Sequence, residues 1–301
     1  MTKTESRERS AAAHRGPSSM GLRTVRWSMA HSFGLEWGFM RTPVLFADRI
    51  ESMFGPVRGS NPVFILGVWS PANAGVVLVW LHHGRSAGRQ SPATRDALEE
   101  AASVVGVPAA GHSCGQGRGA AINGAAGDFP CSPWYTLLPA LGLAVIVGPV
   151  EELGWRGVAR PLLQRRFAPL WASLIVGAFW GLWHAPAFLK SGPPLSGWVF
   201  APYVVGVLAL SVIVTKLFNA AHGSILMAAL VHVQMSAPAW PNAQPWENDP
   251  FALIAVAVMA VNRKVMLSRE DAATGVLMPA TASDDRERRP GGRLVAGTST
   301  R

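Results

Sequence analysis

Two adjacent carboxylates, Glu151 and Glu152, stand at the end of an apolar run in the sequence LAVIVGPVEELGWRG. Residues four apart share one face of a helix, so Glu152 is expected to pair with Arg156. Glu151 points about 100° away from that face, by helical geometry, and is left beside apolar walls. A carboxylate in such a place can act as a general base. The sequence therefore assigns the chemistry to Glu151 and a supporting role to Glu152 and Arg156.

Two histidines lie in later apolar runs. His184 ends the run GAFWGLWHAPAF, one turn after Trp180. His232 lies in GSILMAALVHVQMSAP, with Ser236 one turn later on the same helical face. Each histidine alone is typical of a packed or interfacial residue. Ionisable groups at membrane depth usually have a function, and two Glu and two His in three separate runs exceed what packing needs.

Two chemistries fit these groups. In the first, Glu151 and His184 hold and deprotonate a water that attacks a carbonyl, while His232 and Ser236 stabilise the oxyanion. No cofactor is needed. In the second, the His and Glu side chains bind Zn²⁺, which activates the water. The sequence has no HExxH, so zinc ligands would have to come from three helices. A proton-coupled transporter is a weaker alternative, because no inverted repeat is visible.

The composition indicates which kind of protein must position these groups. The 301 residues are 49% hydrophobic and only 15% charged, against roughly 25% charged in ordinary soluble proteins. Twelve Trp stand against two Tyr, and indole rings favour membrane interfaces. The net charge of +9 lies in tails and short loops and not on one polar face, which argues against nucleic-acid binding. The composition predicts an integral membrane protein.

The apolar runs predict an all-α, polytopic transmembrane helix bundle with a polar cavity inside it. One clear span covers 63–81, and a bundle carrying the candidate site covers 134–262. Runs of this length can cross a bilayer as helices. The runs of the 134–262 bundle are 134–151, 169–187, 197–218, 223–240 and 250–262.

The region before this bundle is harder to interpret. Residues 1–27 form a basic polar tail, and 28–133 is poorly patterned. The run 28–46 carries Glu36 and Arg41, so it is either a poor first span or an interfacial helix. The stretch 82–130 has no helical apolar stripe. If 28–46 and 63–81 both cross, one crossing is missing before 134. Either 28–46 does not cross, or 82–130 has lost a helix, for example through a frameshift.

The basic residues predict the orientation, because cytoplasmic loops carry an excess of Lys and Arg. The segment 156–166 is interpreted as a cytoplasmic loop holding four arginines. The tail 263–301 begins with Arg263 and Lys264 and is expected to be polar, disordered and cytoplasmic. Both termini are then cytoplasmic, and the protein is expected in the cell membrane.

Three ordered motifs resemble one family. EELGWR matches the EExxxR motif of the CPBP family, the CAAX-protease and bacteriocin-processing (Abi) intramembrane endopeptidases. WGLWH resembles its FxxxH motif, with Trp180 where Phe is usual. HVQMS resembles HxxxN, with Ser236 where Asn is usual. Their order and spacing agree across roughly residues 134 to 262.

The resemblance implies a metal-independent glutamic endopeptidase that acts on a membrane-associated peptide or protein, such as a prenylated-like C-terminus. It implies that Glu151 is the base, that His184 shares the water, and that His232 and Ser236 form the oxyanion site. Glu152, Arg156 and Trp180 would support them. Ser offers one hydroxyl donor where Asn offers an amide with two. The alternative is therefore a catalytically impaired scaffold or immunity protein with the same fold.

Overall fold

The computed structural model describes residues 21–83, 95–127, 135, 137–189, 198–236 and 249–276, and every regular element in these ranges is helical. This confirms the all-α fold class. The N-terminal elements are α2 (Leu22–Leu45), α3 (Ala47–Phe54), α4 (Pro62–Val68), α5 (Ser70–His83) and α6 (Arg95–Ile122). They are followed by α7 (Leu137–Gly154), the π-helix η3 (Trp155–Ala159), α8 (Arg160–Gln164), α9 (Pro169–Trp183), α10 (Ala185–Leu189), α11 (Phe200–Ala220), α12 (Ile225–Ser236) and α13 (Asp249–Leu267).

Among the residues that the structure describes, four helical segments are long and apolar enough to cross a membrane, which agrees with the predicted polytopic bundle. They cover Leu138–Gln164, Pro169–Leu189, Phe200–Ala220 and Asp249–Leu267. The predicted span 63–81 is instead the pair α4 and α5, bent by 49°, and it counts as a fifth crossing only if the bent pair is one span. The predicted run 223–240 gives the shorter helix α12, and residues 237–248 lie outside the described ranges.

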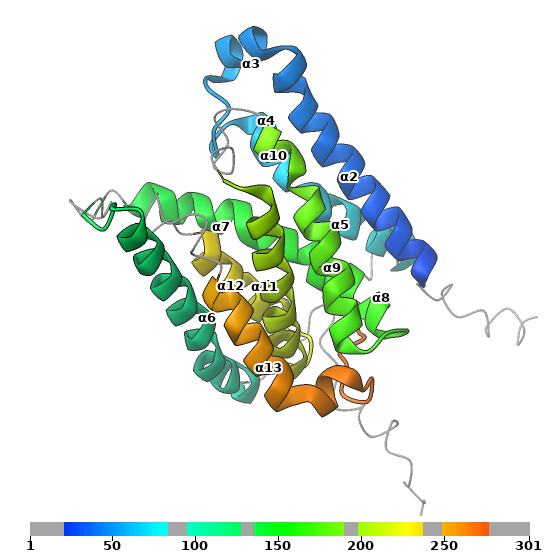
Figure 1. Cartoon of the computed structure of the whole chain (residues 1–301). Coiled ribbons are helices and arrows are strands. Elements are labelled where there is room, and N and C mark those ends of the chain that lie inside the picture. The colour runs from blue at the N-terminus through cyan, green and yellow to red at the C-terminus, as the bar shows by residue number, and fades with distance from the viewer. Residues whose placement is uncertain are drawn as a thin grey trace, which may run out of the picture.

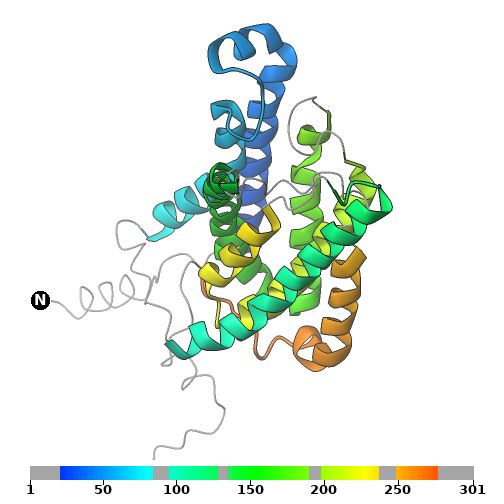
Figure 2. The same cartoon turned by 90° about the vertical axis from the view of Figure 1, so that its left-hand side faces the viewer.

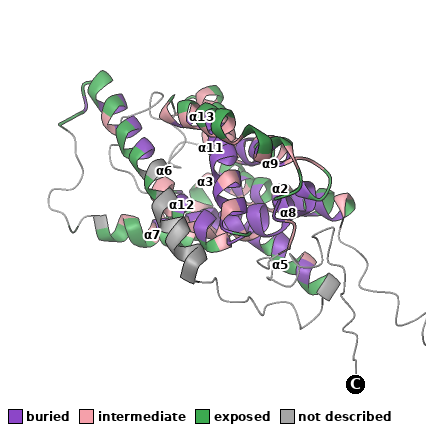
Figure 3. Ribbon diagram, turned by 90° about the horizontal axis from the view of Figure 1, so that it is seen from below, coloured by how far each residue is buried: buried purple, intermediate pink, exposed green. Residues whose placement is uncertain are grey.

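The helices form a bundle with α9 and α11 packed along each other at its centre. Helices α2 and α6 lie on opposite sides of the molecule (Figure 1), and the view in Figure 2 shows α6 crossing in front of α12 and α13. Buried residues concentrate on the central helices, while the outer faces of α6 and α13 are exposed (Figure 3). The candidate site residues lie on α7, α9 and α12, and Glu151, Glu152, Trp180 and His232 are on the buried faces of these helices.

Helices α5 and α7 approach closely because glycine stands at their crossing. A Cβ on Gly154 would collide with the Pro71 carbonyl, and one on Gly75 would lie 3.1 Å from the Leu153 carbonyl oxygen. Small residues let helix backbones come together in this way. The crossing holds α5 against the end of α7, directly beside the two carboxylates.

The sequence suggested that the segment 156–166 is a cytoplasmic loop, but in the structure this segment is not a loop. The chain stays helical through η3 and α8, and Arg156 and Arg160 are fully buried. Arg160 Nη2 lies 3.3 Å from Ser211 Oγ on α11. Both guanidinium groups point inward because Glu152 lies one turn before Arg156 and the negative charge is inside the bundle. Only Arg165 and Arg166 of this segment are exposed.

Two other regions differ from their predicted pattern. Within 82–130 the structure has a long helix, α6, whose Gly111 packs on Ile254 of α13 and whose Arg118 pairs with Asp249. This helix consists largely of small residues, so it shows no apolar stripe. The first part of the predicted tail 263–301 packs on the bundle, since α13 continues to Leu267 and the Gln164 side chain donates to the Ala273 carbonyl at 2.6 Å; residues 277–301 lie outside the described ranges.

Replacing Gly154 by Ala is expected to destabilise the protein by about 1–3 kcal/mol, the usual range for overpacking, because the new methyl would displace the Pro71 backbone. Thermal unfolding of the purified protein in detergent measures the effect. Gly142→Ala is the matched control, since it lies in the same helix with nothing within 4 Å. Equal melting temperatures for the two variants would contradict this account of the α5–α7 crossing.

Candidate active site

Glu152 stands at the centre of a buried ionic cluster. Its Oε1 accepts a hydrogen bond from Arg156 Nη1 at 2.8 Å and another from His232 Nδ1 at 2.7 Å. The pairing with Arg156 is the one expected from the spacing of four. The bond to His232 was not expected, and it ties α12 to the end of α7. Charges buried in an apolar bundle are tolerated when they are paired in this way.

Trp180 on α9 contacts four of the predicted site residues, which are Glu151, Arg156, His232 and, through its backbone carbonyl, His184. Its indole N–H donates to Glu151 Oε2 at 2.8 Å. The Arg156 guanidinium lies 4.2 Å from the centre of the Trp180 ring, within cation–π range. The His232 ring stands edge-on at 5.3 Å between centroids. The surroundings of Glu151 are therefore not entirely apolar, in contrast to the prediction from the sequence, because the indole N–H binds one of its two carboxylate oxygens.

His184 caps the C-terminus of α9 and is fixed by the same tryptophan. Its Nδ1 lies 2.8 Å from the Trp180 carbonyl oxygen. A carbonyl only accepts, so Nδ1 carries the proton and Nε2 keeps its lone pair. The rings of Trp183 and Tyr203 pack edge-on against the imidazole, at 4.7 and 5.4 Å. The ring orientation and the tautomer of His184 are thus both determined by its neighbours.

Ser236 and His232 project toward the same point on α7, which is Gly148. A Cβ on Gly148 would lie 2.6 Å from Ser236 Oγ and 2.8 Å from His232 Cδ2. Gly148 lies one helical turn before Glu152, so the space left by its missing side chain adjoins the carboxylate pair. The two residues of the HVQMS motif therefore face one small space together.

The structure thus brings Glu151, Glu152, Arg156, Trp180, His184 and His232 into one connected cluster, with Ser236 beside it. The sequence analysis did not predict that Trp180 is a hydrogen-bond donor to Glu151. The presence of Trp where the motif usually has Phe could have indicated it, because Trp carries an N–H that Phe lacks. Sequence reasoning also missed Gly148, whose position one turn before Glu152 could have indicated it.

The zinc alternative requires three converging ligands. Within the described ranges, no group of three His, Cys, Asp or Glu side chains is arranged to hold a metal ion. The Nδ1 atom of His184 is hydrogen-bonded to the Trp180 carbonyl, and that of His232 to the Glu152 carboxylate.

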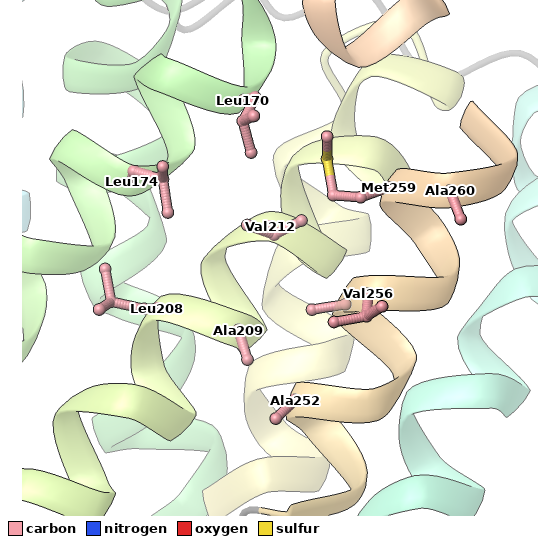
Figure 4. A pocket seen from close by; sticks show the side chains of 10 residues that line it. Leu170, Leu174, Leu208, Ala209, Val212, Ala252, Val256, Met259 and Ala260 are labelled. Atoms are coloured by element: carbon pink, nitrogen blue, oxygen red, sulfur yellow. The ribbon is translucent and has the colours of Figure 1, made fainter. Parts of the chain in front are cut away.

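An apolar groove of about 590 Å³ lies elsewhere, between α9, α11 and α13 (Figure 4). It is lined only by Leu, Val, Ala and Met side chains, among them Leu170, Val212 and Met259. None of the residues of the polar cluster lines it. The groove therefore offers no group for hydrolysis and suits an apolar chain.

Comparison with known proteins gives two matches to the region that contains the cluster. Residues 133–237 match the family described as Type II CAAX prenyl endopeptidase Rce1-like. The chain is also similar to the CAAX prenyl protease 2 of Methanococcus maripaludis, with 32% identity over 101 residues. That alignment covers 32% of this chain and 37% of the relative, so it spans well under half of the relative's length. All three motifs lie inside the matched segment. Together with the apolar helices, the matches place residues 133–237 of this multi-pass membrane protein in the CPBP, or CAAX protease, family.

Proposed function

We propose that this protein is an intramembrane endopeptidase in which Glu151 and His184 activate the attacking water. One observation carries the proposal: a single residue, Trp180, holds both groups. Its indole N–H binds Glu151 Oε2, and its backbone carbonyl binds His184 Nδ1. The remaining acceptors, Glu151 Oε1 and His184 Nε2, are the two atoms that would bind and deprotonate a water between them.

The first step transfers a proton from water to Glu151 as the water oxygen adds to the peptide carbonyl carbon. The carbonyl oxygen becomes an oxyanion, which His232 Nε2–H and the Ser236 hydroxyl stabilise beside Gly148. For this His232 needs a proton on both nitrogens, and the Glu152 carboxylate at Nδ1 balances that charge. In the second step the C–N bond breaks, and the proton held by Glu151 passes to the leaving amine. The products are a carboxylic acid and an amine.

The substrate class follows from the location of the site inside a helix bundle and from the relative's name. We propose a membrane-associated peptide or protein, with a prenylated C-terminal segment as the first candidate. The cell membrane is the proposed location, with the end of the bundle near Arg165, Lys264 and Arg269 facing the cytoplasm. The end of α8, the end of α13 and the start of α2 lie together at this end (Figure 1), in keeping with the positive-inside rule.

Glu151→Gln is expected to lower kcat by about 10²–10⁴, the usual contribution of a general base, because the amide cannot accept the proton from water. Cleavage of a fluorogenic prenylated peptide by purified protein in detergent measures it, with melting temperature as the folding control. Undiminished cleavage would remove Glu151 from the mechanism. Absence of cleavage by the wild-type protein on all peptides tested would favour the non-catalytic scaffold.

The same assay distinguishes the zinc alternative. The glutamate mechanism predicts full activity after dialysis against a chelator. Loss of activity that returns on adding Zn²⁺ would favour a metal-activated water instead.

Trp180→Phe is expected to lower kcat by about 10- to 100-fold, because a hydrogen bond to a charged group contributes about 1.5–3 kcal/mol and Phe lacks the indole donor. Phe is the usual residue of the family motif, but in this chain the Glu151 carboxylate is placed by the N–H. The matched control is Trp171→Phe, an exposed tryptophan on the same helix. Equal effects of the two substitutions would argue against a positioning role for the Trp180 N–H.

Two substitutions at Ser236 should act in opposite directions. Ser236→Ala removes an oxyanion donor and is expected to reduce kcat by about 10²–10³. Ser236→Asn provides an amide donor in the space left by Gly148 and is expected to raise turnover. Steady-state kinetics on the same peptide measures both. A fall in kcat for the Asn variant, with its fold intact, would contradict the assignment of Ser236 to the oxyanion.

A further inference from the structure

Helix α2 presents a stripe of polar residues to the interior of the bundle. Ser28, Ser32 and Glu36 recur every four residues, and all three are buried. Glu36 is only 2% exposed. This carboxyl is the group that prevented the run 28–46 from looking like a clean span, and the water-activating step described above does not use it.

The carboxyl group of Glu36 lies in a space that favours its neutral form. Its Oε2 is buried and has no hydrogen-bond partner. Gly67 on α4 provides the room, since a Cβ there would collide with this oxygen, and Met40 closes the space on the next turn of α2. In the part of the chain that the structure describes, no basic side chain forms an ion pair with Glu36. An ionised carboxylate without a cation is very costly to bury, so such a group keeps its proton.

The Glu36 carboxyl borders the candidate active site. It lies against Gly67 of α4, and α4 packs on α7, the helix that carries Glu151, so the two carboxyl groups are within electrostatic range of each other. Other contacts of the same stripe lead to the site as well. The Ser32 and Ser70 hydroxyls lie 3.4 Å apart, and Ser70 Oγ accepts from the Trp183 indole at 3.2 Å. The Trp183 ring packs on His184.

The other ionisable groups around this carboxyl pair come from six elements. Helices α4 and α10 contain no titratable residue, α5 contains none before His82, and those of α3 (Asp48, Arg49 and Glu51) lie on its exposed surface. Helix α2 itself adds only His31 and Arg41 near Glu36, and both are exposed. The groups on the remaining elements are Glu152 on α7, Arg156 on η3, Arg160 on α8, His184 at the end of α9, Tyr203 on α11 and His232 on α12.

We propose that Glu36 is a positioning residue for the hydrolysis: it stays protonated beside Glu151, so that one negative charge and not two occupies this side of the site. The inference rests on the proposed function, in which ionised Glu151 is the base. Two neighbouring carboxyl groups share protons unequally, because ionisation of one disfavours ionisation of the other. A protonated Glu36 therefore lets Glu151 remain ionised, and loss of the Glu36 proton at alkaline pH would place a second negative charge beside the developing oxyanion and slow the reaction.

Infrared spectroscopy of the purified full-length protein in detergent tests the protonation directly and needs no substrate. The carboxylic-acid C=O band is expected in the wild type at neutral pH and is expected to be absent in Glu36→Gln. In Glu151→Gln the band should persist but disappear at a lower pH than in the wild type, because the neighbouring negative charge is gone. Identical bands in wild type and Glu36→Gln at neutral pH, or an unshifted loss in Glu151→Gln, would overturn the proposal. The second measurement leaves Glu36 in place, so it decides the matter even if Glu36→Gln does not fold.

The pH profile of kcat/KM tests the consequence for the reaction. The wild type should lose activity at alkaline pH, and Glu36→Gln should move this loss upward by about one pH unit or more, because Gln cannot ionise. Tyr203→Phe is the control and should leave the alkaline loss where it is. A shift in the tyrosine variant but not in Glu36→Gln would overturn the inference, as would an unchanged profile in both.

The two experiments separate this inference from the function on which it rests. Cleavage by the wild type but not by Glu151→Gln supports the protease assignment whatever Glu36 does. If the wild type cleaves nothing, the protease assignment fails, while the infrared band and its shift in Glu151→Gln still decide whether Glu36 holds a proton beside Glu151.

Discussion

The need to pair a buried negative charge governs the arrangement of this bundle. Glu152 is surrounded by protein, and its Oε1 receives both Arg156 and His232. An ionised group at such depth is tolerated only with partners, and removing one partner of a buried pair costs about 3–5 kcal/mol. The end of α7, the π-helix that follows it and α12 are therefore held in one relative position. The local π-helical geometry keeps Arg156 on the inner side of the chain, where it lies over the Trp180 ring.

This cluster allows Trp180 to position the two groups that we propose activate the water. The Trp180 side chain donates a hydrogen bond to Glu151, and its backbone carbonyl accepts one from His184, so one turn of α9 positions both groups. A donor on a rigid helix places a group more reproducibly than a donor on a loop. Glycine at position 148 then leaves the space that His232 and Ser236 face. The resulting site is a small polar region enclosed by apolar helices, in keeping with its membership of a membrane protease family.

Much of this arrangement could be predicted from local spacing, and the failures have a common cause. The four-residue interval predicted the pair of Glu152 and Arg156, and apolar runs predicted the helices. The arginines of 156–166 were assigned to a loop because charge normally marks a chain that leaves the membrane. Here two of them are buried within the bundle instead, where Arg156 pairs with Glu152 and Arg160 contacts Ser211. Helix α6 was missed because its small residues pack through close backbone contact, which leaves no apolar stripe to detect.

The sequence by itself determined the fold class, the polar residues placed within apolar runs and their order along the chain, because hydropathy and helical period are local properties. Only the tertiary structure decided which of those residues meet. In the structure Glu152 binds His232, 80 residues away, and Glu151 binds Trp180, 29 residues away. Glu36 is buried near Glu151, more than 100 residues away. Such contacts depend on which helix faces pack together, and packing is a property of the whole bundle that no single segment encodes.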